Sequence, residues 1–125
     1  MMTRHLAPAL LLSLSACATA SAGGDQWASF GERVKAGPVV VRPDRLVEDS
    51  RCPMNARCVW AGRVVIDATV WSNGRRSLVR LESDKPANLA GGTLSIDAIR
   101  PDSFMTNKRP ARAAYRFHFR FDRPN

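Results

Sequence analysis

The sequence contains little of what most catalytic sites are built from. In 125 residues it has two histidines, three cysteines and one tyrosine. It has no Gly-x-Ser-x-Gly or His-Glu-x-x-His motif, and no glycine-rich loop of the phosphate-binding type. Beyond the extreme N-terminus, no run reaches the roughly 18 apolar residues that a membrane-spanning helix needs. We therefore expect a protein that is not an enzyme and needs no cofactor.

What the sequence does contain is enough apolar material for one packed core. Apolar residues make up 45% of the chain and charged residues 24%. This composition excludes wholesale disorder, and the length allows one domain rather than two. The net charge is +8, and arginine supplies most of the positive side.

The N-terminus has the pattern of an export signal. A short cationic start is followed by the apolar run Leu6–Leu14 and then by Leu14-Ser15-Ala16-Cys17. These four residues resemble the signal of bacterial lipoprotein precursors. The resemblance implies a signal peptide over residues 1–16 and a lipidated Cys17 that carries acyl chains such as palmitate. Because Ala18 follows the cysteine, it also implies a cell-envelope protein, anchored in the outer membrane and facing the periplasm.

A second interpretation stays open for the same segment. Cleavage after Ala20 or Ala22 would also fit the small-x-small rule and would release a soluble periplasmic or secreted protein. In either case Cys17 is removed from the cysteine count, which leaves the even pair Cys52 and Cys58. Residues 17–26 are rich in small residues and suit a flexible tether, so residues 27–125 form the expected domain.

Hydrophobic residues in that domain recur with a period close to two, which predicts strands. In the clearest strand, Tyr115–Phe121, aromatic residues alternate with charged ones. Strands are also predicted over Val64–Trp71 and Arg75–Glu82, joined by an Asn73-Gly74 hairpin turn. A further strand follows Gly91-Gly92, with Leu94, Ile96 and Ala98 on one face.

The first part of the domain is less regular. Phe30–Lys35 predicts a short strand. Val39–Val41 and Leu46–Val47 lie on either side of Pro43 and predict a bent or edge strand. The only helix candidate, Asp102–Arg112, has a proline at or near each end and is expected to be a long loop. The fold class we expect is all-β: about six or seven antiparallel strands in a small sandwich or open barrel.

The most specific internal motif lies between two of these strands. It reads Asp49-Ser50-Arg51-Cys52-Pro53, four further residues, and then Cys58-Val59-Trp60-Ala61-Gly62. It resembles the D-S-R-C-P-x4-C-x-W-A-G motif of an uncharacterised family of small exported bacterial β proteins. The similarity extends to the final aromatic strand. It implies a fold type and a compartment, but no activity.

A disulfide is the expected use of Cys52 and Cys58, because export leads to an oxidising compartment. Closing so short a ring contributes about 2.4 kcal/mol by the chain-entropy estimate. We expect Trp60 to pack over the sulfur atoms or into the core. The alternative is Cu(I) held by reduced Cys52, Met54 and Cys58, which are soft ligands. Zinc is not expected, because the cysteine spacing is unusual for it and no nearby histidine completes a tetrahedral site. We expect the disulfide and no metal.

Two surfaces are candidates for binding. A loop closed by a disulfide presents Arg51, Asn55 and Arg57 at little ordering cost, which would suit a protein-recognition or inhibitor module. The polar side of the last strand carries Arg116, His118 and Arg120. For His118 we expect two cationic neighbours and no orienting carboxylate, which is typical of a surface histidine.

The arginine-rich strand has two interpretations. It is either a solvated face that discourages strand pairing between molecules or a site for an anionic envelope component. Nucleic acid is not an expected partner of an exported protein. The sequence thus predicts a lipid-anchored envelope protein with a non-catalytic binding or structural role. Its expected partners are the membrane, reached through the N-terminal lipid, and an anionic component or another envelope protein.

Overall fold

The computed structural model describes residues 26–125 and shows an all-β chain with no α-helix in that range. The predicted signal peptide and almost all of the predicted tether lie outside the described residues. No helix of residues 26–125 is long and apolar enough to span a bilayer. The strands are β1 (Trp27–Ala28), β2 (Val34–Ala36), β3 (Val39–Asp49), β4 (Val64–Ser72), β5 (Arg75–Glu82), β6 (Ala87–Leu89), β7 (Gly92–Arg100) and β8 (Arg116–Asp122).

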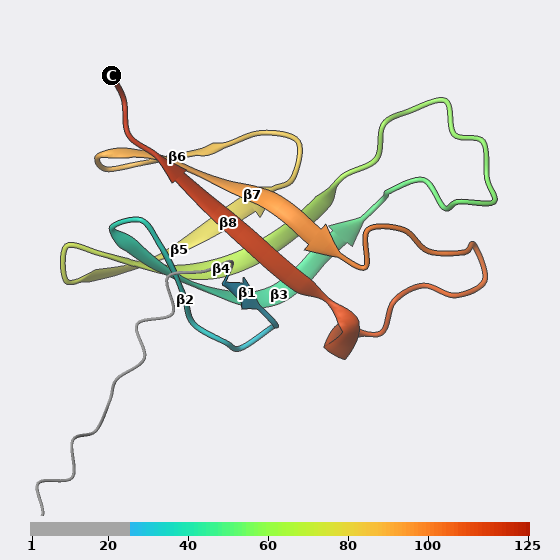
Figure 1. Ribbon diagram of the computed structural model, residues 1–125, viewed down its shortest axis with the longest axis horizontal. Coiled ribbons are helices and arrows are strands. Elements are labelled where there is room, and N and C mark those ends of the chain that lie inside the picture. Colours follow the sequence, from blue (N-terminus) through green and yellow to red (C-terminus); the bar gives the residue numbers. More distant parts are fainter. Residues whose placement is uncertain (1–25) are drawn as a thin grey trace, which may run out of the picture.

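These strands form two antiparallel sheets that pack face to face (Figure 1). The β8 sheet has the order β1-β8-β7-β6, and the β4 sheet has the order β2-β3-β4-β5. No hydrogen-bonded strand pair joins the two sheets, so the sandwich is observed and the open barrel is not. The predicted all-β class is confirmed. The described chain has eight strands rather than six or seven, because the short β1 and β6 carry too few residues for a visible alternation.

The core lies between the sheets and is built from alternate residues of the long strands. From the β4 sheet it takes Val41, Ile66 and Val70, and from the β8 sheet Leu94 and Phe117, all fully buried. Phe30 packs edge-on against Phe117 with the ring centroids 5.1 Å apart. The alternation predicted for the last strand is confirmed, with aromatic side chains inward and charged ones outward.

The hairpin between β4 and β5 is also confirmed. Asn73 and Gly74 have φ angles of 51° and 73°, which are the positive values that a tight two-residue turn of this type requires. Ser72 pairs with Arg75 immediately outside the turn. The turn therefore fixes the register along the whole of both strands.

The strand around Pro43 is more regular than expected. β3 runs without a break from Val39 to Asp49, with a register shift between Pro43 and Arg45. It lies between β2 and β4, but β2 pairs only with residues 39–41. Pro43 therefore lies where β3 has a strand neighbour on one side only, so its missing N–H disrupts no second ladder. The single strand predicted over Phe30–Lys35 is wrong, because the first part of this segment forms a turn before β2.

The predicted inward face of β7 is correct only as far as Ile96. A register shift between Ile96 and Ala98 leaves Asp97 as a bulge residue, and the alternation changes phase there. Ile99, not Ala98, packs against the core. The bulge also turns the Asp97 carboxylate towards β8, where it meets His118.

Candidate functional site

Two long loops lie side by side at one end of the sandwich (Figure 1). We call residues 50–63, between β3 and β4, the stapled loop, and residues 101–111, between β7 and η1 (Arg112–Ala114), the facing loop. The backbone N–H of Met54 donates to the carbonyl oxygen of Phe104 at 2.9 Å. The N–H and hydroxyl of Thr106 donate to Oδ1 of Asn55 at 2.9 and 2.6 Å. Together the two loops form the loop end of the molecule.

An ionic network ties the loop end to the sheets. Asp49, at the end of β3, accepts hydrogen bonds from Nε and Nη2 of Arg51, both at 2.9 Å. It also accepts one from the Tyr115 hydroxyl at 2.6 Å. A third guanidinium nitrogen of Arg51 donates to the carbonyl oxygen of Pro101 at 2.7 Å. Only 3% of the Asp49 side chain is exposed, so this network is internal and links both loops to the core.

Each group of the network has a shifted pKa. Burial alone would raise the pKa of Asp49, but hydrogen bonds from Arg51 and Tyr115 and the charge of Arg51 more than offset it, so its pKa is lowered. The hydrogen bond to Asp49 raises the pKa of Arg51. Burial, with the hydrogen bond to Asp49, raises the pKa of Tyr115 to about 12. The ion pair thus persists at neutral pH beside a neutral phenol.

The neck of the stapled loop is closed by Ser50, Gly62 and Arg63. The N–H of Ser50 donates to the carbonyl oxygen of Arg63 at 2.9 Å, and the N–H of Arg63 donates to Oγ of Ser50 at 3.0 Å. Gly62 packs so closely on this neck that an added Cβ would overlap the Ser50 carbonyl. Asp49, Ser50, Arg51 and Gly62 of the sequence motif therefore hold the loop in place.

Cys52 and Cys58 lie at disulfide distance, with their Cα atoms 5.9 Å apart. Sulfur atoms joined in this way offer no thiolate to copper. Among residues 26–125, no group of three or more His, Cys, Asp or Glu residues gathers where it could hold a metal ion.

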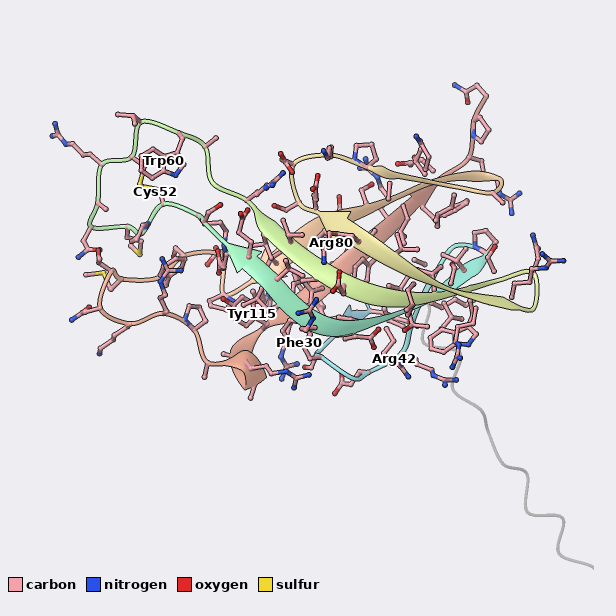
Figure 2. All side chains as sticks on the ribbon, turned by 180° about the vertical axis from the view of Figure 1, so that it is seen from behind. Phe30, Arg42, Cys52, Trp60, Arg80 and Tyr115 are labelled. Carbon is pink, nitrogen blue, oxygen red and sulfur yellow. A yellow bond between two sulfur atoms is a disulfide. The ribbon has the colours of Figure 1, made fainter. Side chains whose placement is uncertain are left out.

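Of the two positions expected for Trp60, the one in the core is wrong, and the one over the sulfur atoms stays a prediction. Its side chain is 63% exposed, beside Val59 at 94% (Figure 2). Met54, in the same loop, is 69% exposed. The loop extends beyond both sheets, so no sheet face is available to cover these side chains. Met105 of the facing loop is also exposed.

The binding residues predicted in this loop therefore have different roles. Arg51 and Asn55 are occupied by contacts within the protein, as described above, and Arg57 alone is exposed without an ion pair. Sequence reasoning missed the apolar residues Met54, Val59 and Trp60. The sequence signal for them was their position in a segment with no strand periodicity, between Pro53 and Gly62.

The predicted face of β8 carries carboxylates as well as arginines. Nδ1 of His118 lies 3.2 Å from Oδ2 of Asp97, so the expectation of no neighbouring carboxylate is wrong. Arg120 pairs with Asp122 at 3.0 Å and with Asp97 at 3.5 Å. Arg116 is exposed and has no ion pair in the described chain. The two carboxylates offset most of the positive charge on this face.

Comparisons of this chain with known protein families, with curated proteins and with solved structures find no match. The geometry alone therefore defines the site. It is a loop end that is closed by a disulfide and by hydrogen bonds and that exposes large apolar side chains.

Proposed function

We propose that this protein is a lipid-anchored, non-catalytic binding module of the cell envelope, and that its loop end recognises another envelope protein. The observation that carries the proposal is the exposure of Met54, Val59 and Trp60 on a loop fixed by a disulfide and by hydrogen bonds. Burying large apolar side chains against a partner is favourable. A loop that is already held in place by a disulfide and by hydrogen bonds loses little conformational entropy when it binds. Tryptophan is also the residue most typical of interface hot spots.

The charges around these side chains indicate the kind of partner. Arg57, Lys108 and Arg109 are exposed on the two loops, and the facing loop has one exposed carboxylate, Asp102. The surface is thus an apolar centre with a mostly cationic rim. It fits a protein that has an apolar pocket bordered by carboxylates.

Photo-crosslinking in the native envelope tests the recognition surface. A crosslinking residue replaces Val59 in one variant and Leu78 in another. Leu78 is the matched control because it is an apolar residue, 83% exposed, on β5. We expect a protein captured from position 59 and not from position 78. In a binding assay with that purified protein, Trp60→Ala should raise the Kd at least about thirty-fold, which corresponds to the loss of a hot spot of about 2 kcal/mol. Equal capture from both positions, or an unchanged Kd, would refute the proposal.

The anchor is tested separately. Mass spectrometry of the mature protein distinguishes acylated Cys17 from a chain that begins after Ala20 or Ala22. A Cys17→Ser variant should be released when the membranes are washed at high salt, because screening removes a domain that is held only by its charge, and it should keep its affinity for the purified partner. If it stays in the salt-washed outer-membrane fraction at the wild-type level, the lipid anchor is wrong.

A further inference from the structure

The outer face of the β4 sheet carries a cationic surface that the sequence does not reveal. The residues Arg33, Lys35, Arg42, Arg45, Arg76 and Arg80 come from β2 or the turn before it, from β3 and from β5. The register shows that they share a face: Trp71 of β4 lies opposite Arg76, and Asp67 lies between Arg45 and Arg80. We call these six residues, with Trp71 and Leu78, the cationic face. Figure 2 looks onto this face and labels Arg42 and Arg80.

Carboxylates neutralise only part of the cationic face. Asp67 is shared by Arg45, at 2.5 Å, and Arg80, at 2.9 Å. Asp44 pairs with Arg42 at 2.6 Å. The other three cations, Arg33, Lys35 and Arg76, have no ion pair in the described part of the chain. Closer to the loop end, Glu48 and Glu82 are balanced by Arg63 and Lys85. The excess positive charge is therefore concentrated at the end of the sheet that carries the Asn73-Gly74 turn.

Two apolar side chains lie among these charges. The guanidinium carbon of Arg33 lies 4.1 Å from the Trp71 ring centroid, and that of Arg42 lies 5.3 Å from it. Leu78 projects from the edge strand β5, between Arg76 and Arg80 along the chain, and is 83% exposed. An aromatic ring in contact with two guanidinium groups, on the same face as an exposed leucine, suits the boundary between lipid headgroups and acyl chains.

We propose that the cationic face docks on the surface of an anionic phospholipid bilayer. Arginine forks bind phosphate oxygens in pairs, and the unpaired cations are attracted by the negative surface potential. The face is spread over four strands, so it can contact several headgroups at once. Trp71 and Leu78 then sit at the level of the headgroups. A duplex nucleic acid would match the charges but would leave Leu78 without an apolar contact.

Docking in this way would also fix the orientation of the domain. The cationic face lies on the outer side of the β4 sheet. The loop end extends from one end of the sandwich (Figure 1). A domain that lies on the bilayer through the β4 sheet keeps its loop end accessible to a partner. The inference does not depend on the identity of that partner, and it holds with or without a lipid on Cys17.

Vesicle co-sedimentation tests the proposal. The full chain carries Cys17→Ser so that no acyl chain contributes, and the vesicles are phosphatidylcholine with or without phosphatidylglycerol. We expect binding to the anionic vesicles only. Lys35→Gln with Arg76→Gln should reduce the partition coefficient about twenty-five-fold, because each cation near such a surface contributes about five-fold. The control is Arg116→Gln with Arg123→Gln, which removes the same charge from two exposed residues, one on β8 and one immediately after it. It should reduce the partition coefficient less than about three-fold.

Tryptophan fluorescence locates the contact. Binding should shift the emission of the protein to shorter wavelength. Trp71→Phe should abolish the shift and Trp60→Phe should preserve it. The reverse pattern would place the membrane contact at the loop end and overturn this proposal. Equal losses from the two double variants, or equal binding to neutral vesicles, would overturn it as well.

A soluble polyanion provides the last comparison. Binding to a short DNA duplex that is stronger than binding to anionic vesicles, and that depends on Lys35 and Arg76, would assign the face to a different ligand. Thermal unfolding of each variant confirms that the compared proteins are folded.

Discussion

At the scale of single residues, Asp49 holds the loop end on the sandwich. Its carboxylate accepts hydrogen bonds from Arg51 of the stapled loop and from Tyr115, which immediately precedes β8. Its backbone carbonyl oxygen accepts from Nη1 of Arg109, in the facing loop, at 2.8 Å. One buried residue thus joins both loops and both sheets. Changes at this point should therefore affect stability and titration rather than direct contact with a partner.

The titration of Tyr115 gives the first prediction. Because its pKa is raised to about 12 in the folded protein, against about 10 in the unfolded chain, the folded state favours the protonated phenol. The corresponding stability is complete below about pH 10 and is lost as the pH rises towards 12. Since Tyr115 is the only tyrosine, the near-ultraviolet absorbance of phenolate reports on it alone. A midpoint near 10 in the folded protein would contradict the hydrogen bond to Asp49.

The second prediction concerns Asp49→Asn. The substitution leaves Arg51 charged and half-buried without its carboxylate, so the free energy of unfolding should fall by about 2–3 kcal/mol at neutral pH. The pKa of Asp49 is lowered by folding. Its contribution is therefore present above its unfolded pKa of about 4 and is lost as the pH falls through the folded value.

Urea unfolding at several pH values measures this difference. The gap between wild type and Asp49→Asn should be largest near neutrality and should narrow below about pH 4. Asp102→Asn is the control, because Asp102 is exposed on the facing loop, and it should change stability by less than about 0.5 kcal/mol. A gap that stays constant with pH would show that the charge of Asp49 is not what stabilises the loop end.

These residues also show where prediction from sequence ends. The sequence identifies Arg51 as a loop arginine and Trp60 as an apolar residue that should be covered. Their true environments depend on the facing loop, about fifty positions further along the chain, which meets Arg51 through Pro101 and does not reach over Trp60. No local pattern carries that information.

At the scale of strands and turns, local patterns were sufficient for much of the fold. Alternation of apolar and polar residues identified β4, β5 and β8, because the face on which a side chain lies follows directly from its position along a strand. The Asn73-Gly74 pair identified the turn between β4 and β5. The bulge at Asp97 was missed because a single extra residue reverses the alternation without changing the composition. Sheet order was missed for a different reason, since it depends on which strands pair across long loops.

The third prediction concerns the neck of the stapled loop. In Gly62→Ala, the new methyl group would overlap the Ser50 carbonyl, so the backbone bond from Ser50 N–H to the Arg63 carbonyl oxygen and the bond from Arg63 N–H to Ser50 Oγ must lengthen. We expect the free energy of unfolding to fall by about 1–3 kcal/mol and amide exchange to become faster across the loop. Ala61→Ser, at an exposed neighbouring position, is the control. If Gly62→Ala is as stable as that control, the neck is more adaptable than its geometry indicates.

At the scale of the whole molecule, the positive charge belongs to the folded domain. Arg4 and Asp25 cancel and are the only charged side chains before residue 26, so the described residues carry the full net charge of +8. The charge is distributed unevenly. On the β8 sheet, the three arginines Arg100, Arg116 and Arg120 face two carboxylates, Asp97 and Asp122. On the cationic face, six cations face only Asp44 and Asp67. The excess of positive charge is therefore larger on the cationic face, where repulsion between like charges destabilises the fold.

This unequal distribution leads to the fourth prediction, that moderate salt stabilises the domain. Raising the ionic strength from about 0.01 to 0.1 M shortens the Debye length from about 30 to 10 Å, which screens repulsion among Arg33, Lys35 and Arg76. The exposed ion pairs weaken too, but each contributes only about 0–1 kcal/mol. The Tm should rise by a few degrees, since about 1 kcal/mol corresponds to roughly 4–8 °C in a domain of this size.

The two double variants separate the screening of repulsion within the cationic face from the weakening of exposed ion pairs elsewhere. Lys35→Gln with Arg76→Gln relieves part of the repulsion, so its Tm should be higher at low salt and should rise less as salt is added. Arg116→Gln with Arg123→Gln, with the same net charge, should respond almost as the wild type does. Over the same range of salt, binding to anionic vesicles should weaken while the Tm rises, because screening acts on repulsion within the cationic face and on its attraction to phosphate alike. A Tm that falls with salt would mean that local ion pairs, rather than excess charge, dominate the electrostatics of the domain.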